Sequence, residues 1–417
     1  MRLHYAMARA AGWLRPVRSP NPAVHPPASQ LEPGVSVVIP SRNGRSLLEA
    51  QLPGIVRDLT AGEIIVVDNG SQDGTAEWLR HAWPQVAVEV SPEPLSFARA
   101  VNRGIARARC SLICLLNNDM LLEPGFFRAL SRAFEQVPDL FCATAQIRFP
   151  QGMRREETGK AVMTQSGPAD FPLRCDEPYP GEDLTWVLYG SGGCSAYDAG
   201  KLRALGALDE VYRPAYMEDL DLGYRAWLRG WPSVYVAGAL VEHRHRATTS
   251  RYYTEAELTA IFEVNYLRFL ARAVASRSVF RRLWQRALRR LLLVATPQAL
   301  AALRAAAGIA LAGGPAPAPA EPEESLLALT DGSVACFPGA APAASGRVLV
   351  ALVDRLETPP PDLLARYAEI TLVRRPEGVT DIPLAFRAAA LQAEKKWGHP
   401  PELSPELAES ASRRHPL

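Results

Sequence analysis

The sequence lacks the features that mark a zinc-binding, secreted or membrane-spanning protein. Its six cysteines are scattered and form no CxxC pair, which argues against a zinc site and favours buried thiols in a reducing compartment. Residues 1–33 contain no apolar core of a secretory signal, and the best candidate for a membrane span, 291–312, is interrupted by Pro297 and Arg304. The formal net charge of +2 favours no class of partner. These absences predict a cytoplasmic protein.

The order of apolar segments predicts an α/β fold with a mostly parallel sheet. Residues 1–33, rich in proline from Pro16 onward, are expected to be a flexible or weakly helical lead-in. After them, short continuous apolar runs typical of buried parallel strands alternate with segments of helical periodicity. Such alternation predicts a sheet with helices on both faces. The predicted strands are 35–40, 63–68, 86–90 and 111–116, and the predicted helices are 46–59, 75–82, 96–108 and 124–136.

The rest of the chain is less regular and ends in a separate small unit. We expect mixed strands and loops over 140–245, helices near 198–205 and 219–229, and a helix over 255–275. The resulting division of the chain is a domain over 34–275, an arginine-rich amphipathic helical segment over 276–312, a Pro/Ala linker over 313–327 and a small α/β unit with a polar tail over 328–417. From residue 264 to 320 there are nine arginines and no acid. Either this stretch lies against an anionic membrane surface, or it packs on the domain with its arginines in solvent.

Polar clusters follow the first two predicted strands. In an open parallel sheet, ligands bind at the carboxyl ends of the strands. A carboxylate at the position of Asp68 can accept hydrogen bonds from a nucleobase or a ribose hydroxyl, whereas Asp73 fits a turn that caps the next helix. The residues predicted to bind the ligand at these two strand ends are Pro40, Ser41, Arg42, Asn43 and Asp68.

Two further clusters lie on the next helix and the next strand end. Asn102, on the predicted helix 96–108, either orients a bound ligand or ties down a loop. Asn117, Asn118 and Asp119 directly follow the strand 111–116, and we expect Asn117 and Asn118 to bind the same ligand as residues 40–43. A hard carboxylate at a strand end suits Mg²⁺ or Mn²⁺ held together with a diphosphate, where the metal neutralises charge on the leaving group. The alternative is a simple turn.

Acidic, glycine-rich and histidine-containing motifs follow in the second half of the domain. Glu218, Asp219 and Asp221 open a predicted helix among apolar neighbours, which can raise carboxylate pKa values and suit a general base. Helical geometry shows that the three cannot all face one substrate, but it does not choose among them. The backbone of Gly192 and Gly193 is expected to approach a substrate closely, and we place it with Glu218 on the acceptor side. His243, beside arginines, is a candidate ligand of a metal or contact of a diphosphate.

Taken together, the motifs resemble family 2 glycosyltransferases. The segments VSVVIPSRNG, EIIVVDNGSQDGT, FARAVNRGI, LLNND and YMEDLDLGYRAW occur in the order of that family, most like a bacterial branch that includes rhamnosyltransferases of cell-surface polysaccharide synthesis. The resemblance covers about 35–275. It implies a GT-A fold, a nucleotide-diphosphate sugar donor, a glycan or lipid-linked acceptor, inversion of configuration and dependence on Mg²⁺ or Mn²⁺.

The resemblance also implies roles for single residues. Residues 40–43 line the nucleotide, Asp68 binds the base or ribose, and Asp219 is the catalytic base. Asp119 and His243 bind the metal; His243 is preferred to His245 because Thr248 follows it by five residues. Asn117 departs from the family pattern, since it replaces the first carboxylate of the metal motif with an uncharged amide.

Two other function classes compete with a transferase of this family. One is a catalytically silent module that binds nucleotide sugars or glycans on the same fold; the presence of Asp119, Asp219 and His243 together argues against it. The other is a dinucleotide-dependent enzyme, which the absence of GxGxxG after the first strand disfavours. We expect a cytoplasmic transferase with peripheral contact to the inner face of the membrane and no nucleic-acid partner.

Overall fold

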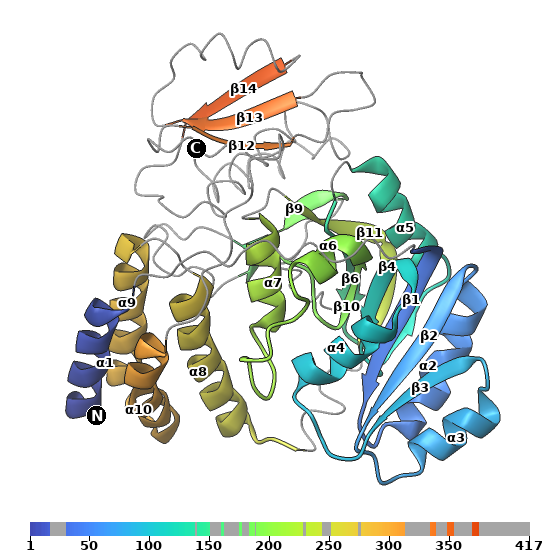
Figure 1. Ribbon diagram of the computed structural model, residues 1–417, viewed down its shortest axis with the longest axis horizontal. Helices are drawn as coiled ribbons and strands as arrows, with labels where there is room; N and C mark the ends of the chain where they lie inside the picture. The colour runs from blue at the N-terminus through green and yellow to red at the C-terminus, as the bar shows by residue number, and fades with distance from the viewer. Residues whose placement is uncertain are drawn as a thin grey trace.

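The computed structural model has one large sheet with helices on both sides and a group of further helices beside it (Figure 1). The nine-stranded sheet runs β3-β2-β1-β4-β10-β6-β11-β5, with β9 also paired to β11. The description covers residues 1–16, 31–137, 140–150, 160–161, 175–176, 183–187, 189–227, 231–243, 252–273 and 277–312, together with the strands 334–338, 348–353 and 369–374.

Four parallel strands form the first half of the sheet, as the apolar runs predict. β1 carries five consecutive buried residues, from Val35 to Ile39, because helices cover both of its faces. β1 pairs with β2 on one side and β4 on the other, and β2 pairs with β3. These strands are β1 (Glu32–Ser41), β2 (Gly62–Asn69), β3 (Val86–Ser91) and β4 (Cys110–Leu116), and the helices between them are α2 (Arg45–Asp58), α3 (Thr75–Ala82) and α4 (Phe97–Arg107).

The second half of the sheet is mixed. β10 runs antiparallel to both of its neighbours, β4 and β6, while β6 and β11 pair in parallel. The short β5 pairs antiparallel with the end of β11, which brings Met120 opposite His243. The elements of this half are β5 (Met120–Leu122), α5 (Phe126–Gln136), β6 (Cys142–Arg148), β9 (Thr185–Val187), β10 (Cys194–Asp198), α6 (Ala199–Ala204), α7 (Glu218–Trp227) and β11 (Ser233–His243); β7 (Lys160–Ala161) and β8 (Cys175–Asp176) pair with each other.

The α/β fold with a mostly parallel sheet is therefore confirmed. Cys110, Cys114, Cys142 and Cys194 are buried free thiols, as expected. Burial raises the pKa of the Cys142 thiol to about 12, which keeps it protonated and inert at neutral pH.

Beside the sheet, four helices pack on one another: α1 (Arg2–Leu14), α8 (Glu255–Ala273), α9 (Arg277–Val294) and α10 (Pro297–Leu311). The segment 1–33, expected to be a flexible or weakly helical lead-in, begins with α1, a regular helix of 13 residues that precedes the prolines. Its small residues Ala8, Ala11 and Gly12 let it approach Trp284 closely, and the Trp284 Nε1 donates to the Ala8 carbonyl at 3.0 Å. Within the described residues, no helix has the length and apolar character needed to cross a bilayer.

The C-terminal unit contributes a separate small sheet in the order β12-β13-β14. Its strands are β12 (Val334–Pro338), β13 (Val348–Val353) and β14 (Glu369–Arg374). The last two correspond to predicted strands at 348–353 and 370–373. The predicted linker and the predicted helix at 384–396 lie outside the described residues.

Candidate active site

The carboxyl ends of β1 and β2 place the first two predicted clusters side by side. Ser41 and Asp68 are partners in the parallel register of the two strands. Both side chains are buried, and Asp68 Oδ1 accepts a hydrogen bond from the Ser71 N–H at 3.1 Å. The Ser71 hydroxyl in turn accepts from the Asn43 N–H at 2.9 Å. The β1–α2 and β2–α3 loops are thus fixed to each other by hydrogen bonds.

A tyrosine that the sequence analysis did not single out completes this side of the site. Asn43 has a left-handed φ of 48°, a conformation that asparagine tolerates better than most residues. Its Oδ1 accepts from the Gln72 N–H at 2.7 Å and its Nδ2 donates to the Tyr252 hydroxyl at 2.8 Å. The Arg42 guanidinium lies 4.2 Å from the centre of the Tyr252 ring. Tyr252, just before α8, therefore contacts two residues predicted to line the nucleotide.

The Asn117–Asp119 loop is anchored to two other elements. Asn118 is buried, and its Nδ2 donates to Ser41 Oγ at 2.8 Å. The buried Gln51 of α2 donates from Nε2 to the carbonyl oxygens of Asn117 at 2.5 Å and Met120 at 2.9 Å. The sequence analysis did not single out Gln51. Its one signal in the sequence is a polar side chain on the apolar face of a predicted helix, which indicates a buried hydrogen bond.

Asp119 and His243 lie together, although 124 positions separate them in the sequence. The pairing of β5 with β11 brings them together, with His243 Nε2 3.5 Å from Asp119 Oδ1. Both are buried, and Asp119 Oδ1 accepts no hydrogen bond in the described part of the chain. The buried Asp119 oxygen that accepts no hydrogen bond from the described residues, together with the neighbouring imidazole, fits a divalent cation. The remaining ligands of such a cation would come from a diphosphate. His245 lies outside the described residues.

The glycines 192 and 193 connect this loop to the acidic motif. The Gly193 carbonyl accepts from the Asn117 N–H at 2.8 Å, and the Gly192 N–H donates to Asp219 Oδ2 at 3.2 Å. A Cβ on Gly193 would come within 2.4 Å of Asn117 Nδ2, so any larger residue at this position would force the Asn117 side chain to move. The backbone at 192–193 thus lies directly between Asn117 and Asp219.

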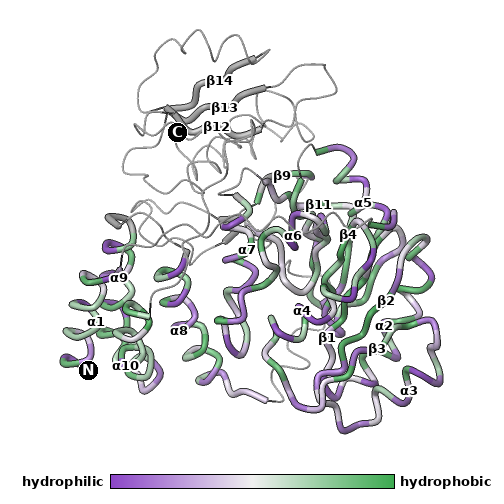
Figure 2. The backbone as a smooth tube through the Cα atoms, in the orientation of Figure 1, coloured by the Kyte–Doolittle hydropathy of each residue, from purple (hydrophilic) through white to green (hydrophobic). Residues whose placement is uncertain are grey.

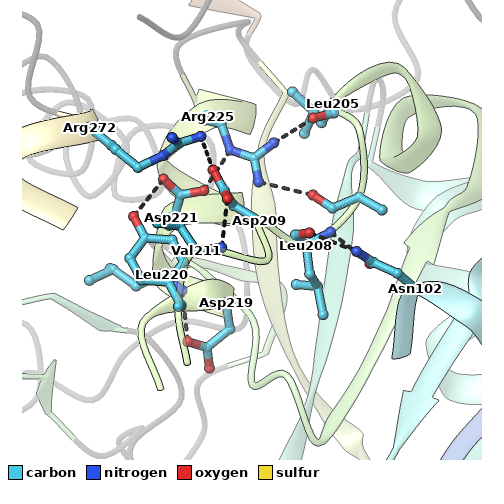
Figure 3. A network of polar contacts seen from close by, with 12 residues as sticks. Asn102, Leu205, Leu208, Asp209, Val211, Asp219, Leu220, Asp221, Arg225 and Arg272 are labelled. Atoms are coloured by element: carbon cyan, nitrogen blue, oxygen red, sulfur yellow. Dashed lines mark hydrogen bonds and ion pairs between the residues drawn. The ribbon is translucent and has the colours of Figure 1, made fainter. Parts of the chain in front are cut away.

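The structure separates the three acids of α7, which the sequence could not do. Asp221 is buried, accepts from the Tyr212 hydroxyl at 3.1 Å and forms an ion pair with Arg225 at 2.7 Å (Figure 3). Glu218 is also buried; desolvation, and next the negative charge of Asp219, raise the pKa of its carboxyl well above the usual range. Asp219 is the most exposed of the three.

A strained turn fixes the start of α7. Tyr216 and Met217, the two residues before Glu218, have φ values of 75° and 78°, which non-glycine residues rarely adopt. The buried Asn265 of α8 holds this turn by donating from Nδ2 to the carbonyl oxygens of Ala215 at 2.7 Å and Tyr216 at 3.1 Å. Asn265 escaped the sequence analysis, because an asparagine within a helical pattern does not identify its partner.

For Asn102, the structure favours the loop-tying alternative over the ligand contact. Its Nδ2 donates to the Leu208 carbonyl at 2.8 Å and its Oδ1 accepts from the Leu208 N–H at 3.1 Å (Figure 3). Because both ends of the amide bond to Leu208, these contacts support the loop-tying role, and contact of Asn102 with a donor stays a prediction. Pro40 precedes Ser41 on β1 and is the register partner of Val67 on β2.

The family model described as "Glycosyltransferase like family 2" matches residues 33–257, more than half of the chain. The chain belongs to glycosyltransferase family 2. This confirms the resemblance seen in the five motifs and the expectation of a glycosyltransferase enzyme on a GT-A type α/β fold.

Relatives of this chain differ in the activities that their names state. N-acetylglucosaminyl-diphospho-decaprenol L-rhamnosyltransferase of Mycobacterium tuberculosis is 28% identical over 213 residues, or 45% of this chain and 68% of the relative. Validoxylamine A glucosyltransferase of Streptomyces hygroscopicus subsp. jinggangensis is 25% identical over 50% of this chain and 54% of the relative. The protein y4gI of Sinorhizobium fredii is 26% identical over 57% of this chain, which spans only 27% of y4gI.

Solved glycosyltransferases also match parts of the chain at low similarity. GalNAc-T7, solved with UDP, GalNAc and Mn²⁺, has a TM-score of 0.46 and 18% identity over 64% of this chain and 54% of its own. The mannosyltransferase PcManGT of Pyrobaculum calidifontis, solved with GDP-Man and Mn²⁺, has a TM-score of 0.41 and 19% identity over 76% of this chain and 84% of its own.

Proposed function

We propose that this protein is an inverting glycosyltransferase that moves one sugar from a nucleotide-diphosphate donor to a hydroxyl of a glycan or lipid-linked acceptor, in cell-surface polysaccharide synthesis. The observation that carries the proposal is the connected network itself. Hydrogen bonds link the strand-end residues Ser41 and Asn118, and the 192–193 backbone links Asn117 to Asp219. A donor-binding region, a cation-binding pair and a candidate base therefore belong to one site. The mycobacterial relative, whose name specifies a lipid-diphosphate acceptor, supports the acceptor class.

On the donor side, the proposed roles follow from the two strand ends. Residues 40–43 line the nucleotide, and Asp68 binds its base or ribose. Asp68 Oδ1 already accepts from Ser71, which leaves the other carboxylate oxygen as the acceptor for a ligand hydroxyl or imide. Asn43 and Asn118 also bond to protein groups, so in addition to lining the donor site they shape the loop around it.

A divalent cation, Mg²⁺ or Mn²⁺, would be held by Asp119 and His243. When bound with the donor, it would stabilise the negative charge that develops on the leaving diphosphate. Asn117 adds no charge to this ligand set. The buried oxygen of Asp119 that accepts no hydrogen bond is the feature that favours a cation here over a simple turn.

We assign the base to Asp219. An inverting transfer needs a carboxylate that removes the proton of the acceptor hydroxyl while that oxygen attacks the anomeric carbon from the side opposite the leaving group. Asp221 is committed to Arg225 and Tyr212, and Glu218 is buried with a raised pKa. Asp219 combines partial exposure with a position at Gly192, which we place with Glu218 on the acceptor side.

Metal dependence is tested by donor hydrolysis and transfer with a panel of nucleotide sugars, with and without Mn²⁺ or Mg²⁺. We expect activity with one donor class, its loss in excess EDTA, and its recovery on addition of metal. Full activity in excess EDTA would contradict the roles of Asp119 and His243. An absence of both hydrolysis and transfer, together with tight binding of the nucleotide sugar, would instead support the silent binding module.

The base is tested by comparing Asp219→Asn with Glu218→Gln. Asp219→Asn should fold normally and bind donor, yet lose roughly two to four orders of magnitude in turnover. Glu218→Gln should change turnover less. If Asp219→Asn keeps near-normal turnover while Glu218→Gln loses it, the assignment of Asp219 is wrong and Glu218 is the base.

A further inference from the structure

Exposed apolar side chains concentrate on the helices that pack beside the sheet. Of the ten large apolar side chains exposed in the described part of the chain, seven lie on α1, α9 and α10. Four of the seven belong to the 13 residues of α1. Exposed apolar side chains that gather on a few neighbouring helices suggest an interaction site. The seven residues are Leu3, Met7, Trp13, Leu14, Leu293, Val294 and Leu311.

α1 is apolar on both of its sides. One side packs on α9 and α10 through Ala8 and Ala11. On the exposed side, next to the packed face, Leu3, Met7 and Leu14 are 69%, 52% and 71% exposed. At 100° per residue, these three lie within about 40° of one another and form a stripe along the helix. Figure 2 shows the hydrophobic character of α1 at the outer edge of this helical group.

Basic residues lie on the same exposed face of α1 as the stripe, and α1, α9 and α10 contain no acids. Arg2 and Arg9 are exposed and lie on the same flank of the stripe as Trp13, at about 80–120° from Leu3 around the helix. The Arg281 guanidinium of α9 lies 4.2 Å from the centre of the Trp13 ring, which adds a further cation at that flank. The sequences of α1, α9 and α10 contain no aspartate or glutamate.

We propose that the α1 face formed by Leu3, Met7, Trp13 and Leu14, with Arg2 and Arg9 beside it, docks on an anionic bilayer surface. An apolar stripe beside arginines, with tryptophan at their boundary, suits insertion between acyl chains and contact with anionic headgroups. A second copy of this chain is a poorer occupant, because two acid-free basic faces repel each other. The proposal goes beyond the proposed glycosyl transfer. Docking on a bilayer would bring the enzyme close to a lipid-linked acceptor.

The experiment measures binding of the full chain to sedimented vesicles of phosphatidylcholine with about 30% phosphatidylglycerol, and to vesicles of phosphatidylcholine alone. We expect binding to the anionic vesicles that weakens with salt. Met7→Gln with Leu14→Gln should weaken it at least about tenfold. Arg2→Gln with Arg9→Gln should weaken it about 30-fold at low salt, given roughly fivefold for each charge.

The matched control replaces Val56 and Val90, two exposed valines outside the helical group, with glutamine, and should leave binding unchanged. Donor hydrolysis is measured in the same preparations and should be unaffected by all of these substitutions. If the intact chain does not bind anionic vesicles, or if Met7→Gln with Leu14→Gln binds as tightly as the parent, the proposal is wrong while hydrolysis still tests the transferase separately. A dimer that dissociates on Met7→Gln with Leu14→Gln, without vesicle binding, would assign the face to a second copy instead.

Discussion

Replacing Asp221 with asparagine distinguishes an acid that supports the fold from one that performs chemistry. The Asp221 carboxylate is the acidic half of a buried ion pair with Arg225 and accepts a hydrogen bond from Tyr212. Arg225 also donates to the carbonyl oxygens of Leu205 at 2.6 Å and Ala207 at 3.0 Å. Asp221→Asn therefore removes one charge from a cluster that ties α7 to the loop before it, and changes almost no volume.

The expected loss of stability follows from these contacts. Removing one partner of a buried ion pair costs about 3–5 kcal/mol, because the remaining charge stays buried. Here the remaining guanidinium keeps its two carbonyl acceptors, and an asparagine oxygen can still accept from Tyr212. The loss should thus fall at the low end, about 3 kcal/mol. At roughly 2–4 °C per kcal/mol for a domain of about 200 residues, the melting temperature should fall by about 6–12 °C.

The assay combines guanidinium unfolding with turnover measured at least about 20 °C below the transition of the weaker variant. Asp221→Asn should lose stability and keep turnover within about tenfold of the parent. Asp219→Asn should show the reverse pattern, with normal unfolding and a large loss of turnover. Unchanged unfolding of Asp221→Asn together with a hundredfold loss of turnover would refute the assignment of Asp221 to the fold.

Three further predictions concern the surroundings of the site. Because burial raises the pKa of Glu218, the folded state loses stability as the pH rises from about 4.3 to that raised value. Glu218→Gln lacks the titrating carboxyl and should be more stable than the parent, by an amount that grows above about pH 4.3. Denaturant unfolding from about pH 5 to 9 measures this difference. Gly44→Ala should weaken donor binding at least about tenfold in calorimetry, because its Cβ would lie 2.3 Å from Asn118 Nδ2. Asn265→Leu should release the turn before α7 and displace Asp219. Steady-state kinetics should show turnover lowered at least about tenfold, with donor affinity retained.

The first half of the sheet was predictable because its signal is local. A parallel strand buried on both faces appears as a continuous apolar run, as at 35–40 and 63–68, and the polar residues after it must lie at the ligand-binding edge. The sequence alone therefore predicts that Ser41 and Asp68, 27 positions apart, lie in one site, and in the structure they are register partners. The direction of β10 carries no such signal, since an antiparallel and a parallel buried strand have the same composition.

Non-local contacts decided what the sequence left open. Asn102 has the same local context whether it binds a ligand or a loop, and only the fold of residues 205–210 around it decides. The choice among the acids of α7 likewise depends on Tyr212 and on the carbonyl oxygens that accept from Arg225. Tyr252 belongs to a different element from Arg42 and Asn43, which it contacts, so no spacing rule could connect them.

Asn117, which stands where the family pattern has the first carboxylate of the metal motif, makes cation binding in the proposed site depend on the donor. In the proposed site, with Asn117 neutral, Asp119 would offer a cation one negative charge and His243 a ring nitrogen. Within the described residues, no group of three acidic, histidine or cysteine ligands exists at which a cation would be held independently. The diphosphate of the donor would supply most of the negative charge around the metal, and a hard cation is bound in proportion to that charge. Cation and donor therefore belong together in the proposed site, and Asn117, held by the backbone of Gly193, is free of the repulsion that a second carboxylate would exert on the incoming diphosphate.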